Sequence, residues 1–217
     1  MPAKKSATAA RKTAAKSTAS KSSQKKQTAP ANMDGQEQDN LLYKLFVDML
    51  KDMLWAEKHL VTQLNTMQTV ATTAQLQEAF EDHKFATQKH VSRLEKVFKL
   101  LGVEPEAKKC DAMEGLTNEA NSMIQETKEG TMTRDAALII AAQKVEHYEI
   151  ASYGSLVQVA RTLGNEEAAS ILEKTLWEEE DTDQLLTDIA ESDINPLADD
   201  EQEEEMEETE EEEEEMA

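Results

Sequence analysis

The sequence contains few of the residues that build β-rich folds. Glycine and proline number only six and four, and aromatic residues make up 4% of the 217 residues. Sandwiches and barrels need many turn residues, whereas the plentiful Ala, Leu, Met, Glu and Gln are good helix formers. The composition therefore predicts an all-α protein.

Other shortages bear on where the protein resides. The single Cys110 excludes an intramolecular disulfide, which fits a reducing compartment. No apolar run approaches the roughly 20 residues of a membrane span, and the N-terminus lacks the apolar core of a secretory signal. A mitochondrial transit peptide is disfavoured because residues 1–33 contain no Leu, Ile or Phe for an amphipathic face. We expect a cytoplasmic protein without a membrane-spanning segment.

Charge is distributed unevenly along the chain. Residues 1–33 hold eight Lys or Arg and no acid, and residues 199–217 hold fourteen acids and no base. The remainder keeps 15 of the 23 bases and 31 of the 45 acids, so it is acidic in its own right. Segments with so few large apolar side chains cannot offset chain entropy by burial. We predict a disordered basic tail over residues 1–38, a folded domain over 39–193 and a disordered acidic tail over 194–217.

Two interpretations of the basic tail are open. It is either a solubilising leader or a nucleic-acid arm like the lysine/alanine tails of linker histones. Lysines scattered among small residues neutralise phosphates without reading sequence, and such binding weakens steeply with salt.

Helical periodicity divides the folded domain into four long segments. Apolar residues recur at steps of three and four over residues 39–71, 75–101, 133–163 and 165–191, with Thr133 as a candidate N-cap and the Asn195-Pro196 pair as a stop. A shorter helical stretch, about residues 113–128, lies between the second and third. Two long helices, a long connection and two more long helices predict a ferritin-like four-helix bundle whose crossover carries a short helix.

Polar residues interrupt the apolar stripes of all four long helices at similar depth. Unpaired carboxylates in a core are costly, so several together favour a bound multivalent cation. Oxygen and imidazole ligands suit divalent iron or manganese, held as one ion or a pair. The candidate metal ligands are Glu57, His83, His90, Glu146, Glu149, Glu179 and Asp183.

Each of these residues, taken alone, is also compatible with a helix-surface acid or a hydrogen-bonded core histidine. Glu178 and Glu180 flank the inward position and are expected to face solvent, and His59 and His147 fit the stripes less well. Tyr153 shares the face of Glu149. Cys110 is either a buried thiol or a redox-active one.

Four strings carry a resemblance to a known family: A-E-K-H-L (56–60), K-C-D-A-M-E-G-L (109–116), R-D-A-A-L-I-I-A-A-Q-K-V-E-H-Y-E-I-A-S-Y-G (134–154) and T-L-W-E-E-E-D-T-D (175–183). They resemble the YciE/YciF family of bacterial ferritin-like stress proteins over about residues 40–192. The resemblance implies a compact cytoplasmic bundle, commonly dimeric, with a rubrerythrin-like metal site. Members are often labelled ferroxidases.

The resemblance carries over to individual positions. The family's A-E-K glutamate matches Glu57, its V-E-H-Y-E matches Glu146, His147 and Glu149, and its E-E…D matches Glu178, Glu179 and Asp183. The second helix departs from the pattern, because the family's H-L-E-E-T reads H-K-F-A-T at residues 83–87. Phe85 and Ala86 stand where the family has glutamates, so the second metal position is in doubt.

Two functions of different class follow. The first is a stress-response protein that binds iron or manganese and has ferroxidase or peroxide-consuming activity. The alternative is a non-enzymatic nucleoid-associated protein, a homodimeric helical scaffold that binds DNA through residues 1–33.

Overall fold

The computed structural model describes residues 40–201, which are mostly α-helical and contain no strand. The chain divides into two units, residues 1–31 and 32–217, and all the described residues belong to the second. The helices are α1 (Leu41–Val70), α2 (Ala74–Leu101), α3 (Asp111–Glu126), α4 (Met132–Thr162), α5 (Glu166–Ile189), the π-helical turn η1 (Ala190–Ile194) and α6 (Asn195–Asp199). The predicted helical class is confirmed for this part of the chain.

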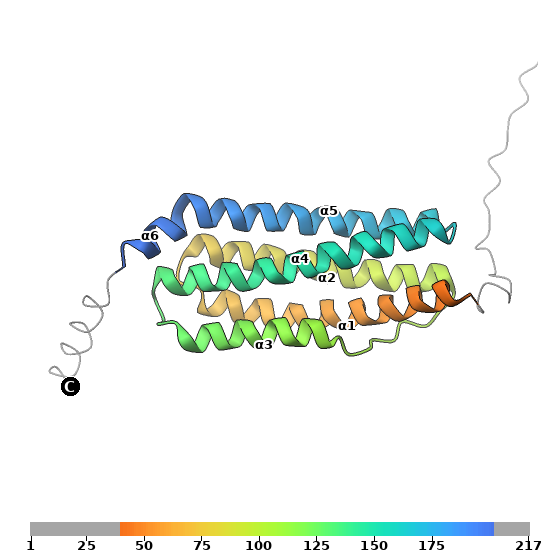
Figure 1. The fold of residues 1–217 in the computed structure, drawn as a ribbon, viewed down its shortest axis with the longest axis horizontal. Helices are drawn as coiled ribbons and strands as arrows, with labels where there is room; N and C mark the ends of the chain where they lie inside the picture. Colours follow the sequence, from red (N-terminus) through yellow and green to blue (C-terminus); the bar gives the residue numbers. More distant parts are fainter. Residues whose placement is uncertain (1–39, 202–217) are drawn as a thin grey trace, which may run out of the picture. The chain divides into compact units, whose positions relative to one another are not determined.

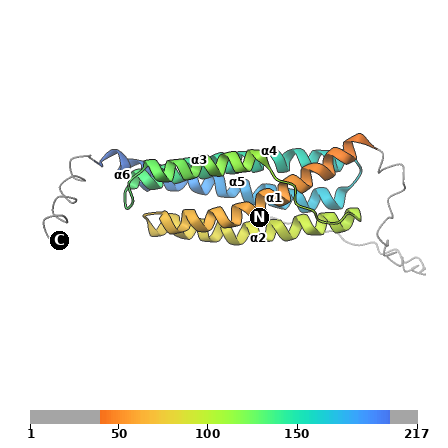
Figure 2. The same cartoon turned by 90° about the horizontal axis from the view of Figure 1, so that it is seen from below.

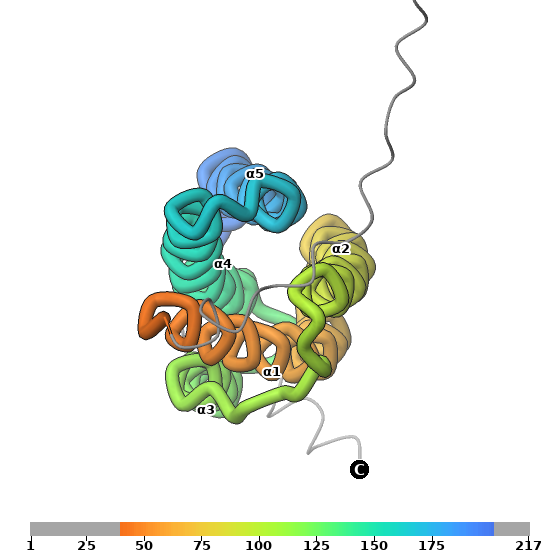
Figure 3. The backbone as a smooth tube through the Cα atoms, turned by 90° about the vertical axis from the view of Figure 1, so that its right-hand side faces the viewer, coloured from red at the N-terminus to blue at the C-terminus, as the bar shows by residue number. Residues whose placement is uncertain are grey.

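The long helices run side by side along one direction (Figure 1). α1 packs on α2, α4 on α5, α2 on α5, and α1 on α4. Seen end-on, these four lie around a common centre, and α3 lies outside them beside α1 and α4 (Figure 3). Seen from below, α3 lies along α4, and α1 lies beside α2 over its later part while its N-terminal end crosses toward α4 (Figure 2). The segment between α2 and α3 crosses α1, where the Lys108 amide donates to the Lys51 carbonyl at 3.0 Å.

Side-chain caps set the starts of the long helices. Each begins after a residue whose side-chain oxygen accepts a hydrogen bond from a first-turn amide, which satisfies one of the unpaired N–H groups there. These residues are Asn40, Thr73, Thr131 and Asn165. The predicted cap of α4 at Thr133 is therefore wrong by two residues. α2 ends at Gly102, which has φ +65°, a left-handed conformation that glycine adopts without strain.

Two apolar clusters fill the bundle, one toward each end. One includes Leu60, Leu64, Leu76, Phe80, Leu138 and Leu186. The other includes Phe46, Leu50, Leu94, Phe98, Leu156 and Leu172. Each long helix passes from one cluster to the other, and at the crossing point it carries buried polar residues. The polar interruptions in the sequence thus form one layer between two apolar regions.

The helical body extends beyond the predicted boundary at residue 193. Ile194 is buried in the first apolar cluster and α6 follows directly, with Pro196 in its first turn, where a missing N–H has no cost. Glu201 accepts hydrogen bonds from the amides of Met132 and Thr133 at 2.5 and 2.9 Å. A carboxylate at a helix N-terminus is favourable there. Residues 194–201 therefore belong to the bundle and not to the acidic tail.

The predicted basic tail over residues 1–38 and the rest of the predicted acidic tail, residues 202–217, lie outside the described part of the chain. The nucleic-acid arm at residues 1–33 is among them. Within residues 40–201, no helix is long and apolar enough to cross a membrane.

Asp135 ties the α1–α2 turn to α4, and its removal should destabilise the fold. Its fully buried carboxylate accepts from the amides of Thr72 and Thr73, at 2.6 and 2.8 Å, and from the Thr73 hydroxyl at 2.8 Å. We expect Asp135→Ala to lower the free energy of unfolding by about 3 kcal/mol, because two half-buried amides lose their acceptor. Urea unfolding followed by circular dichroism measures the free energy of unfolding. The control is Asp188→Ala at an exposed position of α5, which should change that free energy by less than about 0.5 kcal/mol. Equal losses in the two variants would contradict this role of Asp135.

Candidate metal centre

Six of the seven predicted ligands lie together in the polar layer at the middle of the bundle. Their ligand atoms form two groups, within each of which all atoms lie within 4.8 Å of one another. One group is His83, Glu146, Glu149 and Glu179, and the other is Glu57, His90 and Glu179. Every member is buried. Glu179 belongs to both groups, so the two are adjacent and share a carboxylate.

Hydrogen bonds on the outer side of His83 decide which of its nitrogens faces the layer. Its Nδ1 lies 3.4 Å from the Thr182 hydroxyl, which itself donates to the Glu178 carbonyl at 2.9 Å. A hydroxyl has one proton, so Nδ1–H must be the donor to Thr182. The neutral imidazole then presents the Nε2 lone pair to Glu146 Oε1, 3.1 Å away. Two lone pairs so close repel unless a proton or a cation lies between them.

His90 has the same arrangement with different partners. Its Nε2 lies 2.9 Å from Glu178 Oε2, and because a carboxylate only accepts, Nε2–H is the donor. The other nitrogen, Nδ1, lies 2.9 Å from Glu179 Oε1 and 3.6 Å from Glu57 Oε2. Outer hydrogen bonds of this kind fix the tautomer and orientation of metal-binding histidines. When their rings are neutral, both histidines therefore direct a lone pair at the acidic layer.

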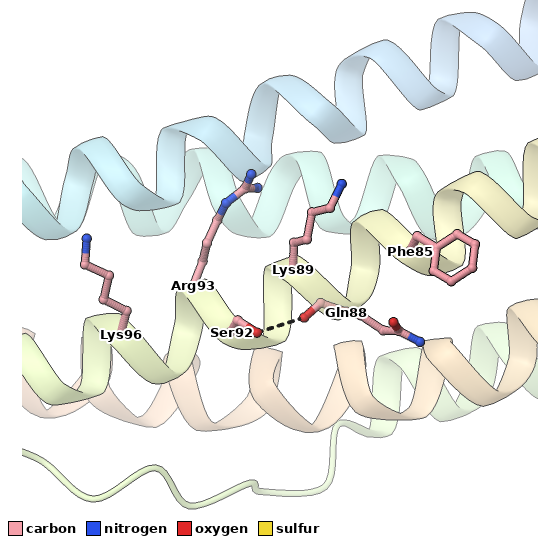
Figure 4. Close-up of a pocket in the computed structure, with 6 residues that line it drawn as sticks. All are labelled: Phe85, Gln88, Lys89, Ser92, Arg93 and Lys96. Carbon is pink, nitrogen blue, oxygen red and sulfur yellow. Dashed lines mark hydrogen bonds between the residues drawn. The ribbon is translucent and has the colours of Figure 1, made fainter.

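Glu178, which was expected to face solvent, takes part in the site. Its side chain is 39% exposed, but it reaches back across the α2–α5 contact to His90. Arg93 donates two hydrogen bonds to the same carboxylate at 2.7 and 2.6 Å, and Figure 4 shows Arg93 extending from α2 toward α5. Arg93 and His90 hold the pKa of Glu178 at about 2. Arg93, one turn after His90 on α2, was a signal in the sequence that an acidic partner lies nearby. That the partner is Glu178 on α5 depends on how the helices pack.

Polar atoms in the layer lack the partners that buried groups ordinarily have. Among residues 40–201, the buried atoms without a hydrogen bond include both oxygens of Glu149 and of Glu179, one oxygen each of Glu57 and Glu146, Nε2 of His83 and Nδ1 of His90. Native cores leave few such atoms, and a bound ion is a standard explanation for them. The other Glu57 oxygen accepts a hydrogen bond from the buried Tyr153 hydroxyl. Carboxylate oxygens and imidazoles that converge without partners fit a divalent metal.

Without a cation the layer must hold protons. Burial alone would lower the pKa of His83 and of His90, but the neighbouring carboxylates outweigh it and raise the two pKa values to about 9 and about 11. Burial raises the pKa of Glu179 to about 7, and burial with the surrounding acids raises that of Glu149 well above its usual value. Protons therefore occupy the layer at neutral pH when no metal does.

Asp183, the seventh predicted ligand, lies outside both groups. It is one turn beyond Glu179, and its carboxylate lies 3.3 Å from Nε2 of His147, whose side chain is 71% exposed. The α5 stripe drifts around the helix over that turn, so Asp183 points to the α4–α5 seam. His147 and His59 also lie outside the groups, and His59 stacks on Trp55 with ring centroids 4.6 Å apart.

Cys110 is a buried thiol that caps α3. Its Sγ accepts from the Met113 amide at 3.3 Å and lies 3.0 Å from the Tyr148 hydroxyl, which donates to Asp52 at 3.2 Å. Burial raises the pKa of the thiol, which keeps it protonated and unreactive. The structure favours the interpretation of Cys110 as a structural residue.

Comparison with known proteins agrees with the resemblance seen in the sequence. The family described as Domain of unknown function (DUF892) matches residues 42–199. Protein YciF of Escherichia coli (strain K12) is 43% identical over 161 residues, which are 71% of this chain and 93% of YciF. The crystal structure of the E. coli stress protein YciF superposes with a TM-score of 0.68 at 42% identity, covering 71% of this chain and 97% of that one.

A second solved structure gives the same picture. YcfI from Rhodopseudomonas palustris has a TM-score of 0.66 and 35% identity, covering 68% of this chain and 94% of its own. Both relatives are matched over nearly their whole length, so the shared region is the helical bundle. The chain therefore belongs to the YciE/YciF family, which the Domain of unknown function (DUF892) describes.

Proposed function

We propose that this protein is a ferritin-like metal-binding stress protein that holds a pair of divalent iron or manganese ions in the middle of its bundle. The observation that carries the proposal is the pair of buried ligand groups that share Glu179. α1, α2, α4 and α5 each contribute to them, and the connection that contains α3 joins the two helix pairs. That connectivity and four-helix donor set are typical of ferritin-like carboxylate proteins.

Charge balance supports two ions over one. The two groups together contain four carboxylates, Glu57, Glu146, Glu149 and Glu179, and two imidazoles. Two divalent cations neutralise four carboxylates while both histidines stay neutral, which avoids burying net charge. α2 supplies no carboxylate, but His83 serves one group and His90 the other. Phe85 is half exposed and takes no part in either group.

Oxygen-rich ligation with one imidazole per group suits iron and manganese better than copper or zinc, which favour more nitrogen or sulfur. Bound iron would supply one-electron redox chemistry, and on that basis we propose ferroxidase or peroxide-consuming activity. The name of the relative, stress protein YciF, is consistent with this role.

The protein's own residues position the ligands and exclude water. Tyr153 donates to one oxygen of Glu57 and leaves the other free to bind. Thr182 holds His83, and Glu178 with Arg93 holds His90, so that each ring has a fixed tautomer. The apolar clusters on either side keep solvent from the layer, which strengthens electrostatic interactions within it.

Metal content should depend on the shared carboxylate. After anaerobic loading with ferrous iron we expect about two ions per chain, as in other dinuclear carboxylate bundles. Glu179→Gln should lower the content to near zero, because both groups lose a ligand, and should abolish any iron oxidation above the buffer rate. Glu57→Gln should remove one ion and leave the other group intact. Elemental analysis of the desalted protein measures the metal content of the wild type and of both variants.

Glu180→Gln is the matched control, since Glu180 is the exposed neighbour of Glu179 on the same helix. It should keep the wild-type content. A wild-type protein that retains no iron or manganese, or equal contents in all variants, would refute the proposal.

The metal-free protein should lose stability as pH rises above neutrality. His83 and His90 have folded-state pKa values of about 9 and about 11, above the ordinary 6.5. The stability they contribute is therefore complete below about pH 6.5 and is lost as pH rises through these values. Glu149 changes in the same direction, because its raised pKa makes ionisation unfavourable in the fold. We expect Tm of the metal-free protein to fall between pH 7 and pH 10.

The control is His83→Gln/His90→Gln, whose Tm should vary less over this range. Added Mn²⁺ should raise Tm of the wild type more at pH 8.5 than at pH 6, since metal ligands must be deprotonated. A metal-free Tm that is flat from pH 7 to pH 10 would contradict the protonation of this layer.

A further inference from the structure

A groove between α2 and α5 leads from the surface to the candidate metal centre. Its volume is about 210 Å³. α2 contributes Ala79, Asp82, His83 and Ala86 to its walls, and α5 contributes Glu178, Asp181, Thr182 and Leu185. Of these residues only His83 is a member of a ligand group. The groove and the metal centre therefore meet at one side chain.

The His83 ring forms the floor of the groove. The residue is only 5% exposed, and its two nitrogens face opposite ways. Nδ1 contacts Thr182, which lines the groove, and the unpartnered Nε2 faces Glu146 in the layer. A single contact of 3.4 Å holds the ring on its outer side. His83 is therefore the residue through which the groove and the buried carboxylates are connected.

The rim of the groove carries uncompensated negative charge. Asp82 and Asp181 are exposed on opposite walls of the groove. Within the described part of the chain, neither side chain forms an ion pair or hydrogen bond with another residue. Glu178, by contrast, is neutralised by Arg93 and His90. Two free carboxylates across a narrow groove lower the electrostatic energy of a cation there.

The adjoining surface of α2 has the opposite charge. Lys89, Arg93 and Lys96 follow one another along the helix beyond the groove (Figure 4). Glu78 and Glu81 precede the groove, and Asp82 lines it. Lys84 is directed to α1, where it donates a hydrogen bond to Gln68. The charge along this surface of α2 thus changes from negative to positive within about two turns after Asp82. A cation is repelled from the basic half and attracted to the end where the groove opens.

We propose that this groove is the route by which divalent cations reach the buried centre, with Asp82 and Asp181 as the attracting pair and His83 as the inner ligand that receives the ion. The proposal rests on the metal-binding function proposed above. It concerns the rate at which the metal enters, whereas the proposed function concerns the amount of metal bound. Thr182 and Ala86 shape the passage, and Ala86 is small enough to leave it open.

The test is the rate at which the full-length metal-free protein takes up Co²⁺, followed by visible absorbance in a stopped-flow instrument. At about 20 mM salt, where screening is weak, we expect Asp82→Asn/Asp181→Asn to slow uptake about fivefold, and the difference to shrink toward none at about 0.5 M salt. The amount bound at equilibrium should stay at the wild-type level, because neither residue is a ligand. Ala86→Trp, which fills the groove, should slow uptake at both salt concentrations.

Glu126→Gln/Glu129→Gln is the matched control, since it removes the same charge from exposed positions at the far end of α3 and just beyond it. It should load at the wild-type rate. Full Co²⁺ binding by the rim variant at the wild-type rate would overturn the route and leave the metal centre standing. A wild-type protein that binds no Co²⁺ would overturn both.

Discussion

The structure depends on burying four carboxylates and two imidazoles in one layer of a helical bundle. Isolated charges of this kind are among the most expensive groups to remove from water. The apolar clusters on either side supply the stability that the layer does not, and they do so with leucines and phenylalanines from all four long helices. Such a layer is stable only when protons or cations are bound in it, so the fold itself favours the binding of positive charge at this place.

The immediate surroundings of the layer are specialised for one orientation of each ligand. His83 and His90 are both held by their outer nitrogens, yet by different means, a threonine hydroxyl in one case and an arginine-paired glutamate in the other. Tyr153 does the same for Glu57. This asymmetry gives the two ligand groups different environments, which is a basis for two metal positions with unequal affinity.

α2 combines three tasks on one helix. Its inner face supplies both histidines, one half of its outer face is basic, and the other half borders the acidic groove. The absence of a carboxylate at Ala86 has two consequences: α1, α4 and α5 provide all four acids, and the small Ala86 side chain leaves the groove open. The two candidate ligand groups are therefore complete without a glutamate at residue 85 or 86.

Much of the fold and of the centre could be predicted from the sequence. Helices follow from apolar spacing and capping residues, which are local properties, and the Gly102 cap follows from its backbone freedom. Six of the candidate ligands, Glu57 and His90 among them, follow from polar residues on apolar stripes, because a helix of known period fixes which side chains share a face.

Only the tertiary structure decided what depends on how the helices meet. The role of Glu178 requires α5 to lie beside α2 at the height of His90, and the exclusion of Asp183 depends on the rotation of α5 against α4. Ile194 and Glu201 continue the bundle because they contact other helices, which no composition rule for an acidic segment reveals. Spacing along one helix is a local quantity, whereas distances between helices result from packing the whole core.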